Sequence, residues 1–188
     1  IRDRYDPTMH FTESSSLVAG NIYSVNDLLS RMIQHSDNGA ALTLYERLGQ
    51  QNFANLLIDL GINIPTADKP IDFVTVKSYA NIFRMLYGAS YLNREYSQKA
   101  LDLMTGSSFE GIPHSLPDAV TASHKFGERT ITTSGDPATF KRELHDCGVI
   151  YAKAGAYTLC IMTQGTNFDD QLSVIQTISK IAYDALEE

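Results

Sequence analysis

The sequence YSVNDLLSRMIQHSDNGAALTLYERLG, residues 23–49, consists of two amphipathic stretches separated by a short polar break. In the first stretch Ser24 is suited to capping a helix, and apolar residues then recur along one helical face: Val25, Leu28, Leu29, Met32 and Ile33. This pattern stops at residues 35–39, HSDNG, which favour helix ends over helix interiors. A second helical pattern follows and ends at Gly49. The stretch predicts two helices joined by a turn that contains residues 36–38, SDN.

Three more helices are predicted before Pro117, each from apolar residues at helical spacing between polar or glycine boundaries. The first covers residues 53–60, and the third runs from Asn93 to Gly106. The second is capped by Thr75 and buries Tyr79, Ile82, Phe83, Leu86 and Tyr87. The prolines at positions 65 and 70 indicate that residues 62–74 form a loop.

After Pro117 the pattern becomes that of β-strands, at residues 120–133, 144–151 and 157–163. The last two flank a hairpin turn at residues 153–155, and an amphipathic helix begins at about residue 167. The apolar runs are nearly continuous, which is typical of a sheet covered by helices.

The predicted fold class is therefore α+β, with helices and an antiparallel sheet that belong to one domain. We expect residues 24–116 to form a helical lobe and residues 117–188 a sheet lobe with a C-terminal helix.

Composition excludes several classes of function. The 188 residues carry a net charge of −7, and a pI near 5.1 argues against nucleic acid or an anionic membrane as the main partner. No apolar run approaches the roughly 20 residues of a membrane helix. The five histidines lack the spacing of a metal motif, so we expect neither a metal nor another cofactor.

Two short strings combine residues suited to acyl transfer: Ser36-Asp37-Asn38 at the helix break, and HKFGE at residues 124–128 on the first predicted strand. Acyl transfer needs a nucleophile, proton transfer to the leaving nitrogen, and donors for the developing oxyanion. A hydroxyl held at a helix break can relay a proton when a lysine ammonium lies near it.

The order of these strings resembles that of the penicillin-recognising serine hydrolases, which include class A β-lactamases and D-alanyl-D-alanine peptidases. In that superfamily an S-D-N turn precedes a K-x-G strand, a hairpin and a C-terminal helix. The flanks agree too, in residues 23–49, in LPDAVTASHKFGE at 116–128, and in HDCGVIYAKAGAYTLCIMTQG at 145–165. The resemblance implies a β-lactamase/transpeptidase-like fold and a hydrolase acting on β-lactams or D-Ala-D-Ala peptides through an acyl-enzyme.

By the same resemblance, Ser36 shuttles the proton and Lys125 supports it and attracts the substrate carboxylate. The Asn38 amide binds the substrate's amide, and Asp37 ties the turn to backbone amides.

The resemblance assigns the next residues of the strand to substrate binding as well. Gly127 lets the backbone approach the ligand, and the backbone N–H of Glu128 is an oxyanion donor. Phe126 stands where the family usually has Thr or Ser, so a hydroxyl for the carboxylate is lost and substrate preference is expected to differ.

Two further departures bear on activity. In that superfamily the nucleophilic serine belongs to an S-x-x-K motif that precedes S-D-N by several tens of residues. No serine of this chain is followed by lysine three positions later. We therefore expect the nucleophile and the first strands upstream of Ile1, in a fragment of the same protein. The chain is then the C-terminal two-thirds of an extracytoplasmic enzyme, inactive alone, with any membrane anchor in the missing N-terminus. Class A β-lactamases have in the corresponding loop a glutamate that activates the water for deacylation. The loop at residues 62–74 has no glutamate, only Asp68 and Asp72, so the resemblance predicts slow deacylation.

Plainer readings stay open. Ser36-Asp37-Asn38 can be an ordinary helix-ending turn, and Lys125 an ordinary strand lysine. A fold-conserving, non-catalytic module that binds peptidoglycan or a protein partner is the main alternative. Cys147 and Cys160 are interpreted as buried apolar residues that form a bridge only if both lie on the same face of the sheet.

Overall fold

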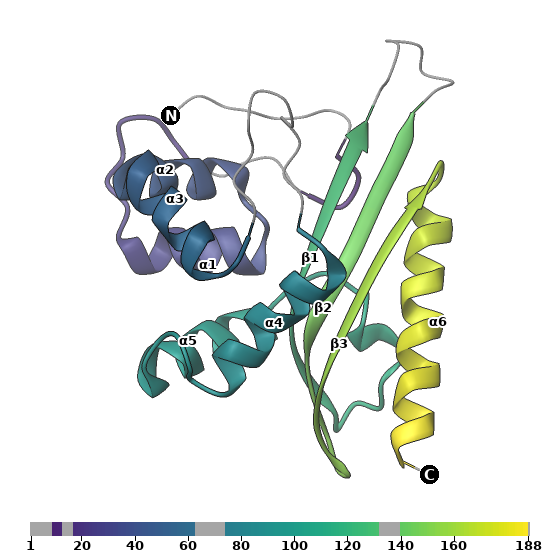
Figure 1. Cartoon of the computed structure of the whole chain (residues 1–188). Coiled ribbons are helices and arrows are strands. Elements are labelled where there is room, and N and C mark those ends of the chain that lie inside the picture. Colours follow the sequence, from purple (N-terminus) through teal and green to yellow (C-terminus); the bar gives the residue numbers. More distant parts are fainter. Residues whose placement is uncertain (1–8, 13–16, 63–73, 132–139, 188) are drawn as a thin grey trace.

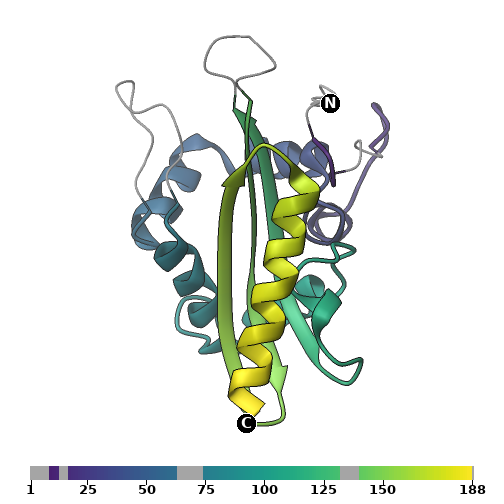
Figure 2. The ribbon, with the colours of Figure 1, turned by 90° about the vertical axis from the view of Figure 1, so that its right-hand side faces the viewer.

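The computed structural model of the chain describes residues 9–12, 17–62, 74–131 and 140–187. A three-stranded antiparallel sheet has one long helix along one face and helices on the opposite side, as Figure 1 shows. Figure 2, turned by 90°, shows the long C-terminal helix running along the strands. No helix within the described ranges is long and apolar enough to cross a membrane.

Five helices precede the sheet: α1 (Val25–Gln34), α2 (Asn38–Leu48), α3 (Gln50–Asp59), α4 (Val76–Tyr87) and α5 (Arg94–Thr105). The predicted caps are confirmed, because the side chains of Ser24, Thr75 and Asn93 each accept a hydrogen bond from the amide three residues later. Most of the predicted loop lies outside the described residues.

The sheet has the order β1-β2-β3, with β1 at Thr121–Ile131, β2 at Lys141–Ala152 and β3 at Gly155–Gly165. The last two strands are longer than predicted, and only residues 153 and 154 join them. The ladder continues through polar positions such as Arg142 because backbone groups form it whatever the side chains are. Residues 132–133 of the first predicted strand lie outside the described ranges. A short η1 (Pro113–Ser115) precedes the sheet and α6 (Phe168–Glu187) follows it.

Side chains of the strands alternate between two hydrophobic clusters, one on each face of the sheet. The cluster toward α6 contains Phe126, Leu144, Ile150, Phe168 and Ile175, and the cluster toward α4 and α5 contains Phe83, Leu101, Met104, Cys147 and Val149. The alternation matters for function, because it decides which residues of β1 face the helices that carry the S-D-N turn.

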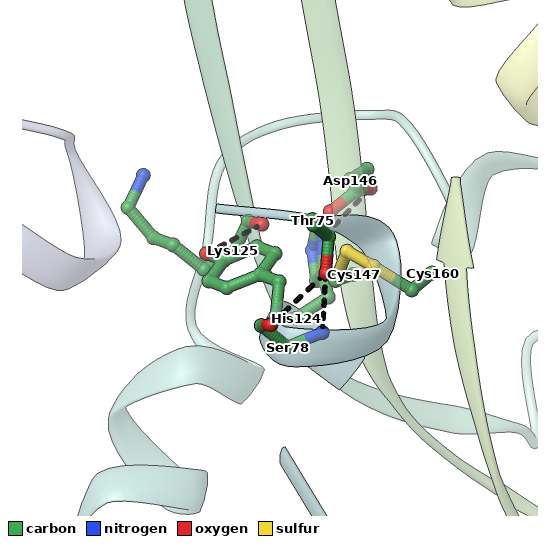
Figure 3. Close-up of a disulfide and its surroundings, with 8 residues drawn as sticks. Thr75, Ser78, His124, Lys125, Asp146, Cys147 and Cys160 are labelled. Atoms are coloured by element: carbon green, nitrogen blue, oxygen red, sulfur yellow. Dashed lines mark hydrogen bonds and ion pairs between the residues drawn. A yellow bond between two sulfur atoms is a disulfide. The ribbon is translucent and has the colours of Figure 1, made fainter. Parts of the chain in front are cut away.

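The two cysteines form a disulfide between neighbouring strands, a pairing that the sequence left open. Cys147 on β2 lies directly opposite Cys160 on β3, with the Cα atoms 4.0 Å apart. Both side chains face the helices, and Figure 3 shows the bridge beside α4. The condition that the sequence set for a bridge is met, because the register places both side chains on one face.

Some side chains on the predicted apolar helix faces are exposed, Val25 and Tyr87 most of all. Val25 is 57% exposed and Tyr87 is 56% exposed. Both lie at ends of their helices, where the apolar face runs past the neighbours that cover the middle of the helix.

Candidate active site

Ser36 lies in the turn between α1 and α2, where the chain takes an unusual backbone conformation. Its φ is +53°, in the left-handed region that costs a non-glycine residue about 1 kcal/mol or more. The turn is held by backbone bonds, since the amides of His35 and Asp37 both donate to the Arg31 carbonyl at 3.1 Å. The Ser36 hydroxyl therefore lies in a turn that is closed by backbone hydrogen bonds.

The rest of the S-D-N string begins α2. Asp37 is its N-cap and is 4% exposed, and its Oδ1 accepts a hydrogen bond from the Ala40 amide at 3.0 Å. Asn38 is the first residue of α2 and is exposed, so its amide is accessible from outside. Asn38 also lines an apolar groove of about 910 Å³ between α1, α2 and α3.

Lys125 of β1 meets the S-D-N turn. Its Nζ donates a hydrogen bond to Ser36 Oγ across 89 residues of sequence, and a second one to the Phe126 carbonyl at 2.9 Å. The hydroxyl of Tyr79 on α4 donates to the Lys125 carbonyl at 3.5 Å. The structure thus brings together Ser36 and Lys125, the two residues predicted to be catalytic.

The protonation of Lys125 is altered by its surroundings. Burial lowers the pKa of its ammonium from 10.5 to about 8, because a charged group loses favourable interactions with water. The carboxylates of Asp146 and Glu128 act in the opposite direction. The ammonium is thus poised to give or take a proton near neutral pH.

Phe126 does not occupy the place that its predicted role in substrate binding requires. Its ring is 5% exposed and stacks on Phe109 with the centroids 4.1 Å apart, in the cluster toward α6. The side chain points there because residues of β1 alternate between the two faces. This corrects the prediction of a substrate contact: the ring instead approaches the Lys125 ammonium, whose Nζ is 4.2 Å from its centroid.

Gly127 is required by packing within the protein. A Cβ at this position would lie 2.4 Å from Nε2 of His145, which stands opposite it on β2. The imidazole therefore occupies the space that the missing side chain leaves. Sequence reasoning missed His145, because only the register of β1 and β2 reveals its position.

Glu128 uses its side chain to hold the N-terminal segment. The carboxylate accepts hydrogen bonds from the amides of His10, Phe11 and Thr12 at 2.8, 2.9 and 2.6 Å. The Phe11 ring then packs edge-on against Phe109, with the centroids 5.2 Å apart. The only role predicted for this residue was that of its backbone N–H, and the carboxylate contact was not foreseen.

A buried pair of titratable side chains lies on the α6 side of the same strands. His124 Nδ1 lies 2.9 Å from Asp146 Oδ1, and the two side chains are 1% and 0% exposed. The amide of Ile112 donates to the other carboxylate oxygen at 2.8 Å. Figure 3 shows Asp146 beside His124 and the Lys125 side chain extending away from the disulfide. Sequence reasoning predicted a packed or hydrogen-bonded His124 and missed Asp146.

The described part of the chain offers no cluster of side chains that could bind a metal ion. No group of three histidine, cysteine, aspartate or glutamate side chains is close enough there to hold an ion.

Comparisons with known proteins show the family and the fold of the chain. The family model described as Beta-lactamase enzyme family matches residues 4–186. A search of curated proteins finds no match. Among solved structures, PBP-A is 20% identical with a TM-score of 0.71, covering 88% of this chain and 62% of its own length.

Two further structures are similar in fold. A PBP-A mutant described as an acyl-enzyme complex with penicillin G is 19% identical with a TM-score of 0.74, covering 92% of this chain and 65% of that one. A class A beta-lactamase from Bacteroides cellulosilyticus is 23% identical with a TM-score of 0.72, covering 87% and 64%. At these identities the likeness shows the fold, and the predicted β-lactamase/transpeptidase-like α+β fold is confirmed. The chain spans less than two-thirds of the length of each of these three structures.

Proposed function

Because this chain belongs to the beta-lactamase enzyme family, we propose that the natural polypeptide carrying it is a serine hydrolase of β-lactams or D-Ala-D-Ala peptides. Catalysis proceeds through an acyl-enzyme. The observation that carries the proposal is the hydrogen bond between Lys125 Nζ and Ser36 Oγ, which joins the two sequence motifs at one place.

In this proposal Ser36 delivers the proton to the leaving nitrogen. Because its oxygen accepts a hydrogen bond from the Lys125 ammonium, its own hydrogen is directed elsewhere and is available to the substrate. Lys125 then returns a proton to the hydroxyl, a step favoured by its lowered pKa. Asp37, which caps α2, keeps the turn in place during these transfers.

Substrate recognition uses groups on both sides of Ser36. The Lys125 ammonium attracts the carboxylate that β-lactams and D-Ala-D-Ala peptides share. The exposed amide of Asn38 bonds the substrate's amide, and the backbone N–H of Glu128 stabilises the oxyanion.

The nucleophile is proposed to come from an upstream fragment of the same protein. None of the chain's lysines follows a serine by three positions. The apolar groove beside Asn38, lined by residues that include Leu42, Leu44 and Phe53, is suited to an apolar helix that would carry the nucleophile.

An extracytoplasmic location is the natural setting for this enzyme. The Cys147–Cys160 disulfide supports it, because disulfides persist in oxidising compartments and are rare in the cytosol.

The proposal is tested by incubating the natural polypeptide with a fluorescent penicillin and locating the label by mass spectrometry. We expect a covalent adduct on a serine outside residues 1–188. We also expect Ser36→Ala and Lys125→Ala to slow its formation by about 100-fold or more, as removal of an acid–base group does. Lys153→Ala, in the exposed β2–β3 turn, serves as a control and should label normally. No adduct together with no hydrolysis of the penicillin, or an adduct within residues 1–188, contradicts the proposal.

A non-catalytic module that binds peptidoglycan or a protein partner is the second candidate. It is favoured by Phe126, whose ring is in the core, and by Glu128, whose carboxylate is engaged by residues 10–12. Binding of a peptidoglycan fragment without any covalent adduct would select this candidate.

A further inference from the structure

His145 is a partly buried imidazole on the same face of the sheet as Lys125, and the acyl-transfer steps above leave it unused. It stands opposite Gly127 in the β1–β2 ladder. Its Nε2 and Cε1 lie 2.4 and 2.5 Å from the place where a Cβ of residue 127 would be. The imidazole is thus one residue along β1 from the N–H of Glu128, the proposed oxyanion donor.

The ring borders a cavity. Together with Tyr79, Gly127 and Arg129 it lines a space of about 530 Å³, which is large enough for several water molecules. The ring of Tyr79 holds the imidazole edge-on, with the centroids 5.5 Å apart. Among the described residues, no side chain or backbone group is hydrogen-bonded to either imidazole nitrogen.

The surroundings favour the neutral form of this imidazole. Burial is the main cause that lowers the pKa of His145, and the cations of Lys125 and Arg129 on β1 act in the same direction. The carboxylates of Asp146 and Glu143 on β2 oppose them. A neutral imidazole with a free nitrogen beside a cavity is a proton acceptor.

We propose that His145 is the general base that activates water for hydrolysis of the acyl-enzyme. This inference rests on the proposed function. A water molecule in the cavity passes one proton to the imidazole as its oxygen forms a bond to the acyl carbon. The tetrahedral intermediate then collapses, the bond between the acyl carbon and the nucleophilic serine oxygen breaks, and the imidazolium returns the proton to that oxygen. The products are a free carboxylic acid and the regenerated serine.

The loop at residues 62–74, from which slow deacylation was predicted, leaves the role of the base open. The loop has no glutamate, and its only acids are Asp68 and Asp72. These two aspartates are the competing candidates for the base, so the experiment includes both.

The test measures acylation and deacylation separately in the natural polypeptide, using a fluorescent penicillin followed by a chase with unlabelled drug. For His145→Gln we expect acylation within about threefold of the unmodified protein and an adduct that lasts about 100-fold longer or more. Asp68→Asn and Asp72→Asn should leave the lifetime unchanged, as should His114→Gln, which alters a histidine with a largely exposed side chain. Thermal unfolding checks that each variant is folded.

Two further readouts separate a base from a packing residue. In the unmodified protein the deacylation rate should rise with pH through a pKa below 6.5 and then level off, and this rise should be lost in His145→Gln. In His145→Ala, added imidazole should restore deacylation by filling the space that the ring leaves.

The outcomes are distinct. Unchanged adduct lifetimes in His145→Gln, or a long-lived adduct only in an aspartate variant, overturn the role of His145 and leave the proposed function standing. Absence of any adduct in both the unmodified protein and His145→Gln, with no penicillin hydrolysed by either, overturns both.

Discussion

The ammonium of Lys125 and the hydroxyl of Ser36 form a hydrogen bond that connects strand β1 to the turn between α1 and α2. It is a contact between the sheet and the helices, formed by residues that are far apart in sequence. The two side chains are therefore expected to act as one unit.

A double-mutant cycle tests that unit. Ser36→Ala and Lys125→Ala should each lower the acylation rate by about 100-fold or more, and the double variant should be no slower than the slower single variant. Removing either partner already abolishes the shared proton transfer. Rates of covalent labelling measure this, and effects that simply multiply would show that the residues act independently.

The pH dependence of acylation should reveal the loss of the proton from the Lys125 ammonium. Because burial lowers its pKa to about 8, the ammonium is fully present below that pH and is lost above it. Acylation should therefore decline above about pH 8, and Lys125→Arg should remove this decline because guanidinium stays charged. A profile that stays flat through the alkaline range would argue against an acidic ammonium.

The lowered pKa of Lys125 also affects the free energy of unfolding. Between about 8 and 10.5 the unfolded chain holds a proton on this lysine that the folded chain has released, so this group makes stability rise with pH. Urea unfolding of the unmodified protein and of Lys125→Met across that window would measure the difference, and the variant should lack this component.

The sequence allowed prediction of the helices, their caps and the S-D-N turn, because each depends on neighbouring residues. Ser24, Thr75 and Asn93 are examples, since a cap bonds an amide only three residues away. Ser36 and Lys125 were also predictable as a pair, through the resemblance of their surroundings to a known family.

The remainder of the site depends on strand register and could not be read from the sequence. His145 faces Gly127, and Cys147 faces Cys160, only because each strand pairs in one of many possible alignments. Phe126 points toward α6 for a different reason: neighbouring residues of a strand face opposite sides, and Lys125 next to it faces the helices.

Loss of the disulfide should destabilise the protein without altering its fold. The bridge joins two residues that are 13 positions apart, for which chain entropy predicts about 3 kcal/mol. Urea unfolding of a variant carrying Cys147→Ala and Cys160→Ala should show this loss. Reduction of the unmodified protein provides the matched measurement, and an unchanged midpoint in both would contradict the expectation.

Glu128→Gln should release the N-terminal segment. The substitution keeps the shape of the side chain but removes the charge that attracts the amides of residues 10–12. A loss of about 1–3 kcal/mol is expected, as for hydrogen bonds to a charged group. Faster hydrogen exchange confined to these three amides is the sign to look for, and unchanged exchange would count against the contact.

Residues 1–188 produced alone should associate or unfold. The groove beside Asn38 is lined mainly by apolar residues, and β1 and β3 are both edges of the described sheet. Analytical ultracentrifugation would distinguish the outcomes, and a well-folded monomer would show that these surfaces need no partner.

The contact between residue 127 and the imidazole opposite it couples two positions by volume. Enlarging either side chain alone causes a steric collision. A larger residue at position 127 combined with a smaller one at position 145 preserves the total volume. Protein engineers who wish to diversify this part of the cleft therefore need libraries in which the two codons vary jointly. In natural descendants of this chain, a change at one position should accompany a compensating change at the other.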